Sequence, residues 1–308
     1  MARVLVGTSS WADPGFVEEW YPPDLAACDR LAWYAERFDV VELNSSFYAL
    51  PNRAAAARWA EITPPGFTFD VKLHRLLSRH AAPLDSLPPD LREDADVGPR
   101  GRVRLTPELE ARMCERLLEE VAPLAEAGRL GAFLLQLSPA FAPGEHELVE
   151  IRPLVERLDP WPVAVELRHR AWASTPERLE ETLQALEDMH AAFVCVDAPE
   201  GDSIMMMPAV DAVTRDDLAY LRAHGRNAHG FVHGKTVAER FGWVYSEHEL
   251  RELAARVGDL AGLAQDVRTM FNNNRGADAP QAARQFRALL GQNPGPEPVR
   301  EPAQGTLL

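Results

Sequence analysis

Side chains that can carry charge or hydrogen-bond a ligand recur along this chain, each time within or just after a short apolar run. Carboxylates, lysine and histidine can transfer protons, arginine can hold an anion, and side-chain amides can bind sugars or bases. In chain order the eight positions carry Trp11, Glu42 with Asn44, Lys72 with His74, Gln136, Glu166 with Arg168 and His169, Asp197, Arg222 with His224, and Asn272 with Asn273. This regularity predicts a single pocket in which the eight positions meet.

The apolar runs that would position these residues are continuous, as is typical of parallel strands buried on both faces. They cover residues 4–7, 40–43, 67–73, 132–137, 163–167, 193–196, 218–223 and 267–271. Helical spacing of apolar residues lies between them, at 25–38, 52–62, 106–124, 175–189 and 247–257. The alternation predicts an α/β fold, a single (β/α)8 TIM-like barrel whose active face is formed by the carboxyl ends of the strands.

The barrel domain is expected to span residues 1–291, followed by a Pro-rich tail at 292–308 that we expect to be disordered. Two connections, 74–105 after the third strand and 224–246 after the seventh, are longer than the others. Long loops in a compact domain usually bind or cover something. We therefore expect both to act as walls or lids of the pocket.

The composition excludes several classes of protein. A formal net charge of -15 argues against nonspecific binding of duplex nucleic acid, which requires many lysine and arginine contacts to phosphate. Cys28, Cys114 and Cys195 are widely spaced and predict neither a disulfide framework nor a zinc site. No stretch is apolar enough to cross a membrane and no signal-peptide pattern is present. We expect a soluble cytoplasmic protein.

Alternation along the strands places Glu42 with Asn44, and Glu166 with Arg168, on the face that points into the barrel mouth. Each has a structural alternative. Glu166 and Arg168 could form an ion pair that only closes the barrel. His169 could cap a helix, and Asp197 could shape the turn before Pro199. One shared pocket explains the eight positions more simply than separate structural roles do.

The residues also resemble a known family, the YecE-like proteins or domain of unknown function 72. The resemblance rests on 7–11 (GTSSW), 41–48 (VELNSSFY), 69–72 (FDVK), 135–139 (LQLSP), 165–169 (VELRH), 224–227 (HGRN) and 271–274 (FNNN), together with Asp197. It extends from about residue 3 to 291 and implies a TIM-barrel-like fold without implying a reaction. It adds Tyr48, His80, Arg226 and Tyr245 to the candidate site residues.

The positive groups favour an anionic substrate, because Lys72, Arg168, Arg222 and Arg226 can hold phosphate or carboxylate. The preferred hypothesis is a hydrolase or lyase acting on a phosphorylated or nucleic-acid-derived substrate, which includes a small anionic molecule or short single-stranded nucleic acid. Glu166 or Glu42 would be the general base and Lys72 or Arg168 the electrostatic stabiliser, with Asp197 and His224 as further catalytic candidates. The aromatic rings of Trp11, Tyr48 and Tyr245 could stack on a base.

Two other functions remain open. A noncatalytic barrel that binds an anionic metabolite would use the same pocket, and would be favoured if Glu42 and Glu166 are each locked by arginine. No cofactor is expected, but a divalent metal ion in an isomerase or endonuclease-like enzyme is possible, with Glu42, Glu166, Asp197 and His224 as ligands. A retaining glycosidase is less favoured, since the strand ends that usually carry its carboxylate pair offer Gln136 and His224.

Overall fold

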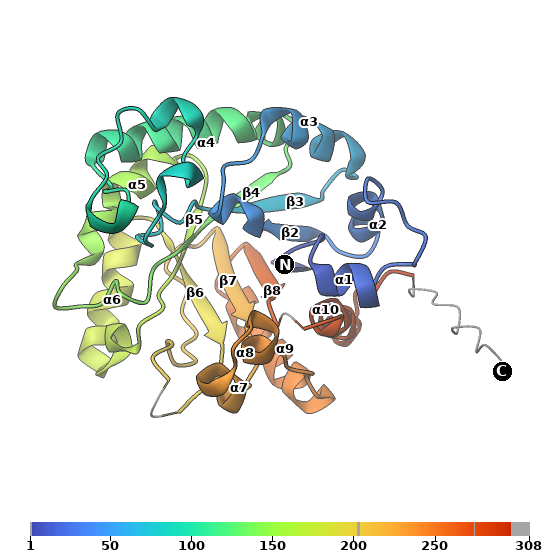
Figure 1. The fold of residues 1–308 in the computed structure, drawn as a ribbon. Helices are drawn as coiled ribbons and strands as arrows, with labels where there is room; N and C mark the ends of the chain where they lie inside the picture. The colour runs from blue at the N-terminus through green and yellow to red at the C-terminus, as the bar shows by residue number, and fades with distance from the viewer. Residues whose placement is uncertain (1, 202–203, 274, 297–308) are drawn as a thin grey trace.

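A computed structural model describes residues 2–201, 204–273 and 275–296, and Figure 1 shows its eight-stranded barrel surrounded by helices. All eight strands are parallel, each pairs with the next in the chain, and the last closes onto the first. They are β1 (Arg3–Thr8), β2 (Val40–Leu43), β3 (Thr68–Lys72), β4 (Leu130–Gln136), β5 (Val163–Glu166), β6 (Ala192–Asp197), β7 (Leu218–Ala223) and β8 (Asp266–Phe271). The predicted (β/α)8 barrel is confirmed.

The helices cover the outside of the barrel, and most of the longer ones begin at a residue whose side chain caps the helix. Asn52, Thr106, Thr175 and Ser246 each accept a backbone hydrogen bond at a helix start. The helices are α1 (Pro14–Glu19), α2 (Arg30–Ala35), α3 (Arg53–Ile62), α4 (Pro107–Glu126), α5 (Arg152–Arg157), α6 (Pro176–Asp188), α7 (Ala228–His233), α8 (Val237–Phe241), α9 (Glu247–Ala261) and α10 (Asp278–Leu289).

The first predicted helix is shorter than expected, since only α2 forms within 25–38. The preceding backbone is used in turns, with the Leu25 N–H donating to Pro22 O at 3.1 Å and the Asp29 N–H to Ala26 O at 3.0 Å. The crossover from β6 to β7 also differs from the expected alternation. Its described residues, 198–201 and 204–217, contain neither helix nor strand.

The two connections expected as walls contain short helices. The first carries the 3₁₀ turns η2 (Leu84–Ser86), η3 (Pro89–Leu91) and η4 (Pro99–Gly101), and the second carries α7 and α8. The Ser138 N–H donates to Ser78 O at 3.0 Å, and the ring of Phe241 lies 6.2 Å from that of His224. Both connections therefore lie against the carboxyl end of the barrel. Three further 3₁₀ turns are η1 (Asn44–Phe47), η5 (Leu148–Ile151) and η6 (Arg170–Ala173).

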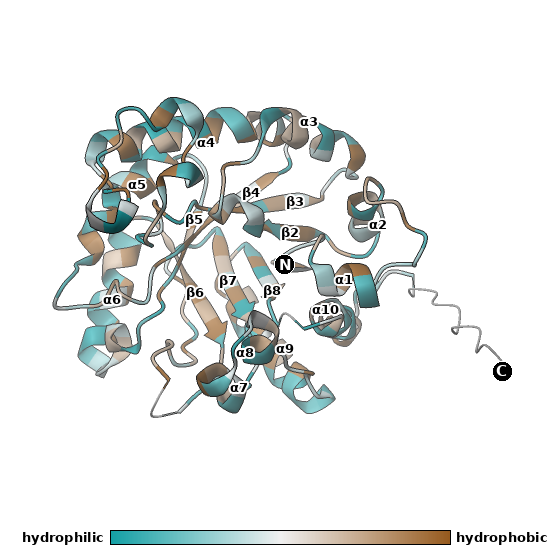
Figure 2. Ribbon diagram, viewed as in Figure 1, coloured by the Kyte–Doolittle hydropathy of each residue, from teal (hydrophilic) through white to brown (hydrophobic). Residues whose placement is uncertain are grey.

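Strand register decides which side chains point into the barrel. Tyr220 is paired with Arg268, and Arg222 with Met270, so these four share the interior with Glu42 and Asp70, which are also paired. Figure 2 shows hydrophobic colour along much of the strands and hydrophilic colour on the surrounding helices. The interior of the barrel nevertheless holds charged residues at both ends.

The start of the predicted tail is anchored to the barrel domain. Gln292 donates to Val4 O at 2.9 Å, and Arg37 donates to Pro296 O at 3.2 Å. The expectation of disorder from residue 292 is therefore not met for 292–296. Backbone carbonyls of this segment accept hydrogen bonds from arginine side chains of the barrel domain. Residues 297–308 lie outside the described residues. In the described part of the chain, no helix combines the length and apolar character needed to cross a membrane.

Candidate functional site

The centre of the barrel mouth is a guanidinium held between two carboxylates. Arg222 of β7 donates from Nε to Glu42 Oε1 at 2.7 Å and from Nη2 to Glu42 Oε2 at 2.9 Å. Its Nη1 contacts Glu166 Oε2. All three side chains have no exposed surface. Three strands that are distant in sequence, β2, β5 and β7, are therefore joined by one buried ion-pair network.

Glu166 has more partners than any other acid at the mouth. Its Oε1 accepts from Arg168 Nη1 at 2.9 Å and Gln136 Nε2 at 3.0 Å, and lies 3.1 Å from His224 Nε2. Burial alone would raise the pKa of the Glu166 carboxyl, but Arg222, His224 and Arg168 hold it well below its usual value. A carboxylate in this state is a weak proton acceptor.

Lys72 stands beside this network without a carboxylate of its own. Its Nζ donates to Gln136 Oε1 at 2.9 Å and lies 4.6 Å from the centre of the Phe47 ring. Among the described residues it forms no ion pair. Burial and the nearby Arg222 lower the pKa of Lys72 from 10.5 to about 7, against the opposing effect of the two glutamates. Both protonation states are therefore populated near neutral pH.

His224 links Glu166 to β8. Its Nε2 faces Glu166 Oε1, and its Nδ1 lies 2.9 Å from Asn272 Nδ2. Since an amide nitrogen only donates, Nδ1 accepts and the proton of the neutral ring lies on Nε2. Burial lowers the pKa of His224, with Glu166 opposing that shift. The ring is a neutral donor to Glu166.

Above the buried network lies a rim of partly exposed polar side chains, Asn44, His80, Gln136, Arg168 and Asn272. Two buried atoms of this rim, Asn44 Oδ1 and His80 Nε2, have no hydrogen-bond partner among the described residues. Burial lowers the pKa of His80 to about 4, with a hydrogen bond to the Gln136 backbone opposing the shift. Buried polar atoms in native proteins are normally satisfied, so these two are positions where a bound molecule would gain hydrogen bonds.

Three expected pocket residues have structural partners instead. Asp197 pairs with Arg226 Nη2 at 2.9 Å and accepts from Tyr245 Oη at 2.6 Å, and Arg256 of α9 is 3.5 Å away. Because Val196 is the residue of β6 registered with the inward Arg222, the neighbouring Asp197 points to the outer, helix-facing side. Asp197, Arg226 and Tyr245 therefore anchor the connection between β7 and α9, which corrects their assignment to the pocket.

The aromatic residues expected to stack on a base do not meet. Trp11 packs edge-on against Trp59 of α3 at 5.4 Å and against Phe69 at 6.1 Å, in the layer between barrel and helix. Tyr245 is buried. Tyr48 is 65% exposed beside Phe47, with ring centres 5.2 Å apart. Only Tyr48 of the three offers an open ring near the rim.

Two histidines and one asparagine predicted to bind substrate serve local structure. His169 Nδ1 accepts from the Ala171 N–H at 3.2 Å and caps η6, the alternative that the sequence also allows. His74 is fully buried and its Nδ1 accepts from the Leu76 N–H at 3.2 Å. Burial lowers the pKa of His74 to about 4. Asn273 donates to Trp243 O at 2.7 Å. These contacts fix turns at the strand ends.

Three residues at the mouth were missed by the sequence analysis. Ser9 Oγ lies 3.5 Å from Arg222 Nη2, and Ser46 Oγ donates to Lys72 O at 2.5 Å. Phe47 places its ring next to the Lys72 amine. Ser9 could have been found by continuing the alternation of β1, but Ser46 and Phe47 act from a 3₁₀ turn, where strand alternation does not apply.

The residues at the mouth do not fit a metal site. Within the described ranges, no group of three or more His, Cys, Asp and Glu side chains is arranged to hold an ion. Of the four suggested ligands, Glu42 and Glu166 are occupied by arginine and Asp197 points away. Cationic groups at Arg222, Arg168 and Lys72 would also repel a metal ion.

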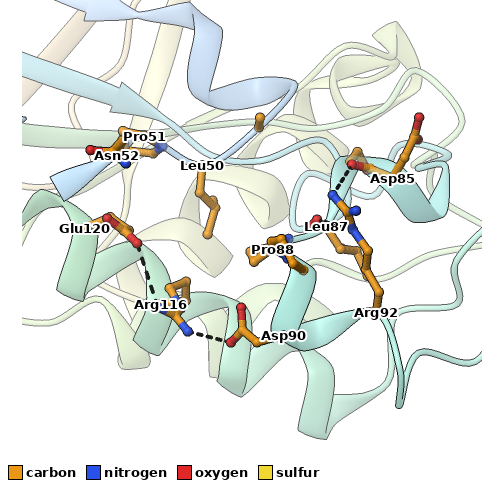
Figure 3. A pocket seen from close by; sticks show the side chains of 13 residues that line it. Leu50, Pro51, Asn52, Asp85, Leu87, Pro88, Asp90, Arg92, Arg116 and Glu120 are labelled. Carbon is orange, nitrogen blue, oxygen red and sulfur yellow. Dashed lines mark hydrogen bonds and ion pairs between the residues drawn. The ribbon is translucent and has the colours of Figure 1, made fainter. Parts of the chain in front are cut away.

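A surface groove of about 300 Å³ lies away from this cluster. Figure 3 shows its walls, formed by Leu50 and Asn52 before α3, Leu87 and Pro88 of the first long connection, and Arg116 and Glu120 of α4. None of these residues contacts the Glu42, Glu166 and Arg222 network. We place the candidate site at the barrel mouth, where the reactive groups converge.

The fold is a TIM barrel, and at the mouth of the barrel Arg222 bridges two buried glutamates, Glu42 and Glu166. A family model described as "Protein of unknown function DUF72" matches residues 5–305, so the chain belongs to the DUF72 family. It is 27% identical to UPF0759 protein YunF of Bacillus subtilis over 93% of this chain and 94% of that protein. It is 30% identical to UPF0759 protein YecE of Escherichia coli K12, over 58% of this chain and 53% of YecE.

Solved structures show the same fold. A DUF72 family protein of Thermotoga maritima superposes with a TM-score of 0.75 at 27% identity, covering 94% of this chain and 100% of that one. A DUF72 family protein of Enterococcus faecalis gives a TM-score of 0.77 at 24% identity, covering 99% of this chain and all of that one. The family resemblance of the sequence and the barrel are both confirmed.

Proposed function

We propose that this protein is a lyase or hydrolase that binds a small phosphorylated or carboxylated substrate at the carboxyl end of the barrel. The observation that carries the proposal is an excess of positive charge beside unpartnered polar atoms. Glu42 and Glu166 supply two negative charges, whereas Arg222, Arg168 and protonated Lys72 supply three positive charges. The remaining charge lies near the rim, where Asn44 Oδ1 and His80 Nε2 have no hydrogen-bond partner within the described ranges.

An anion at this rim would be held by Lys72 and Arg168. Among the described residues, Arg168 forms one side-chain hydrogen bond, from Nη1 to Glu166, and its side chain is 14% exposed. Its other N–H groups are therefore available to phosphate or carboxylate, for which the planar guanidinium is well suited. A short nucleic acid is less favoured than a small molecule, because Trp11 and Tyr245 do not contribute stacking surfaces. Cytoplasmic location stays a prediction from the sequence.

The contacts of the two glutamates argue against the general-base role that the sequence suggested for them. Both oxygens of Glu42 are held by Arg222, and Glu166 is held by two arginines, Gln136 and His224. The Arg222 guanidinium also lies between the two carboxylates, which argues against the paired-carboxylate mechanism of a glycosidase. We assign both glutamates to positioning Arg222 and Arg168, and we place the proton-transfer chemistry on Lys72.

The paired glutamates also support a second candidate, a barrel that binds an anionic metabolite without transforming it. Both candidates require the same anion site. They differ in whether Lys72 reacts with the ligand or only attracts it.

The anion site can be tested by thermal unfolding with inorganic phosphate, phosphoenolpyruvate and uncharged glycerol. A ligand that binds only the native state raises the Tm. We expect the two anions to raise the Tm and glycerol at equal concentration to leave it unchanged. The variant Arg168→Met should weaken anion binding about tenfold, the equivalent of losing one charged contact. Arg170→Met, which changes an exposed arginine two residues away, is the matched control. Equal responses of both variants would overturn the proposal.

A further inference from the structure

Lysine is rare in this chain, and that rarity directs attention to Lys72. The sequence has 32 lysine and arginine residues, of which 30 are arginine and only Lys72 and Lys235 are lysine. Lys235 is exposed, in the second long connection, whereas Lys72 is 9% exposed at the barrel mouth. This chain uses arginine for nearly every positive charge, yet it has a lysine at the barrel mouth, where the charged side chains converge.

An arginine at position 72 would serve an anion at least as well as lysine does. Guanidinium gives more hydrogen bonds to phosphate or carboxylate and stays charged at all physiological pH values. What only lysine offers is a nitrogen lone pair after loss of a proton. The surroundings of Lys72 favour that loss, since Arg222 and Arg168 are close and no carboxylate pairs with the amine in the described part of the chain.

We infer that Lys72 forms an imine with an aldehyde or ketone, and that the substrate is a small carbonyl compound carrying a phosphate or carboxylate. This inference rests on the anion site proposed above and narrows its substrate class. The Nζ atom is held in place by Gln136 Oε1 at 2.9 Å, and the Phe47 ring covers it at 4.6 Å. Lysines that are desolvated and next to another cation are the ones that act as imine-forming nucleophiles.

The step balances without a cofactor. The lone pair of neutral Nζ attacks the carbonyl carbon and a C–N bond forms. The carbonyl oxygen leaves as water after taking up two protons, one from Nζ and one from solvent, which gives a protonated imine. This imine withdraws electrons, so a bond to the adjacent carbon breaks, its electron pair forms an enamine, and the other fragment leaves as a neutral carbonyl compound whose hydroxyl proton passes to solvent. The enamine carbon then takes up a proton, and water adds to the restored imine to release the carbonyl product, a proton and the neutral amine. This sequence gives a lyase.

His80 is placed to assist the transfer of protons in this step. Its Nε2 has no partner in the described residues, its ring lies 5.0 Å from the Phe47 ring, and the charge of Lys72 contributes to lowering its pKa. The ring is neutral at pH 7, so one nitrogen can accept a proton while the other donates. We treat His80 as a positioning and proton-transfer candidate beside the amine.

Borohydride trapping tests the inference, because hydride reduces an imine to a stable secondary amine. The folded full-length protein is incubated with pyruvate and sodium borohydride, and adducts are located by peptide mass mapping. Near pH 7 we expect Lys72 to be labelled at least about tenfold more than Lys235, because a larger share of its amines is neutral. Labelling of Lys72 should level off above about pH 8, while labelling of Lys235 continues to rise.

Lys235 is an internal control that requires no variant. Equal labelling of the two lysines, a parallel rise of both with pH, or the absence of a Lys72 adduct would overturn the inference. Protein unfolded in urea should label both lysines equally, which shows that selectivity comes from the fold. In the variant Lys72→Arg the adduct should vanish, whereas Lys235→Arg should retain it.

The same protocol separates this inference from the proposed anion site. Phosphate should still raise the Tm of Lys72→Arg, since a cation remains, although no imine can form. A Tm shift without a Lys72 adduct in the wild type would leave the anion site standing and reject the imine. Uncharged dihydroxyacetone should label Lys72 less than pyruvate does. Equal selective labelling by both would retain the imine and reject the anion site.

Discussion

The two ends of the barrel interior both bury charge, but they balance it differently. At the amino end of the strands, Asp70 accepts from the Ala132 N–H at 3.0 Å and from Tyr220 Oη at 3.1 Å, and lies 3.4 Å from Arg268 Nη1. Arg268 Nη2 also lies 3.9 Å from Asp266 Oδ2, and Asp266 pairs with Arg3, so two carboxylates face two guanidinium groups. Arg268 also donates to Thr68 Oγ1 at 2.5 Å. At the mouth, two carboxylates face two arginines and a lysine.

The difference teaches which buried charges serve the fold. At the amino end the nearby cavity of about 360 Å³ is lined by Thr68, Gly131 and Arg268, and Arg268 Nε has no hydrogen-bond partner among the described residues. The charges there nevertheless cancel, two carboxylates against two arginines. Burial raises the pKa of Asp70, and the neighbouring Arg268 opposes that shift. At the mouth the pKa of Glu166 is lowered, so both glutamates face Arg222, Arg168 and, when it is protonated, Lys72, which leaves one positive charge that the fold does not cancel. Uncancelled charge indicates the functional end.

The largest predicted effect is the loss of stability when a carboxylate at the barrel mouth is neutralised. Glu166→Gln removes one negative charge from between Arg222, Arg168 and His224, so buried positive charge stays unpaired. We expect a loss of about 3–5 kcal/mol in the free energy of unfolding. Urea unfolding followed by circular dichroism at pH 7.5 measures it. A loss below that of an exposed pair, about 1 kcal/mol, would contradict the network.

The second prediction concerns the pH dependence that Lys72 gives to stability. The pKa of Lys72 is about 7 in the folded protein, against an ordinary value of 10.5 for a lysine in the unfolded chain. Between pH 7 and pH 10.5 the unfolded chain therefore binds more protons than the folded protein. The free energy of unfolding of the wild type, relative to Lys72→Met, should therefore increase from pH 7 to pH 9, by up to about 1.4 kcal/mol per pH unit.

Below pH 7 the same difference should become constant, because Lys72 is protonated in both states. Lys235→Met is the control, since it removes a lysine whose side chain is exposed, and the prediction requires the pH-dependent difference to be specific to Lys72→Met. Parallel pH profiles of Lys72→Met and the wild type would show that the amine is not desolvated.

The third prediction tests packing at the amino end. A Cβ at Gly131 would lie 2.3 Å from Asp70 Oδ1 and 3.0 Å from Arg268 Nη2. Gly131→Ala should therefore destabilise the protein by about 1–3 kcal/mol, through overpacking of the charged pair. Gly258→Ala in α9, where a Cβ meets nothing within 4 Å, should instead be neutral or stabilising. Similar losses in both variants would mean that Gly131 is not close-packed against the pair.

The smallest effect is expected for Asp70→Asn. Burial raises the pKa of Asp70, whereas the pKa of Glu166 is lowered, so the charged form is less strongly favoured at Asp70 and a neutral amide should cost less there. We expect a loss of about 1 kcal/mol, clearly below that of Glu166→Gln, in the same urea experiment. If the two losses are equal, the contrast between the two ends is lost.

Much of the fold could be predicted from the sequence, because β strands buried on both faces and capped helices have local signals. The continuous run at 218–223 forms β7 and the helical spacing at 106–124 forms α4, both as expected. Between β6 and β7 the sequence shows no helical spacing, and the described residues there form no helix. At 25–38 the apolar spacing is present, but turns before Arg30 use the backbone and shorten the helix to α2.

Alternation placed Glu42, Glu166 and Arg168 toward the barrel mouth, and the structure brings these side chains together with Arg222 there. The expectation that a residue at the end of an apolar run faces the pocket does not hold for Asp197 and Trp11, which face the helices. Strand alternation fixes the side of a residue only when the register of its neighbours is known, and that register is set by the closed barrel. Phe47 shows the other limit, because its ring reaches Lys72 from a turn.

The guanidinium of Arg222 joins residues 180 and 56 positions away in the chain. A half-barrel made of the first four strands would hold Glu42 without its arginine, and one made of the last four would hold Glu166 and Arg222 without Glu42. In either half alone, a charged side chain would have to be buried without its full set of ion-pair partners. Assembly of the barrel is thereby made all-or-none, and contacts this distant in sequence slow the search that leads to it.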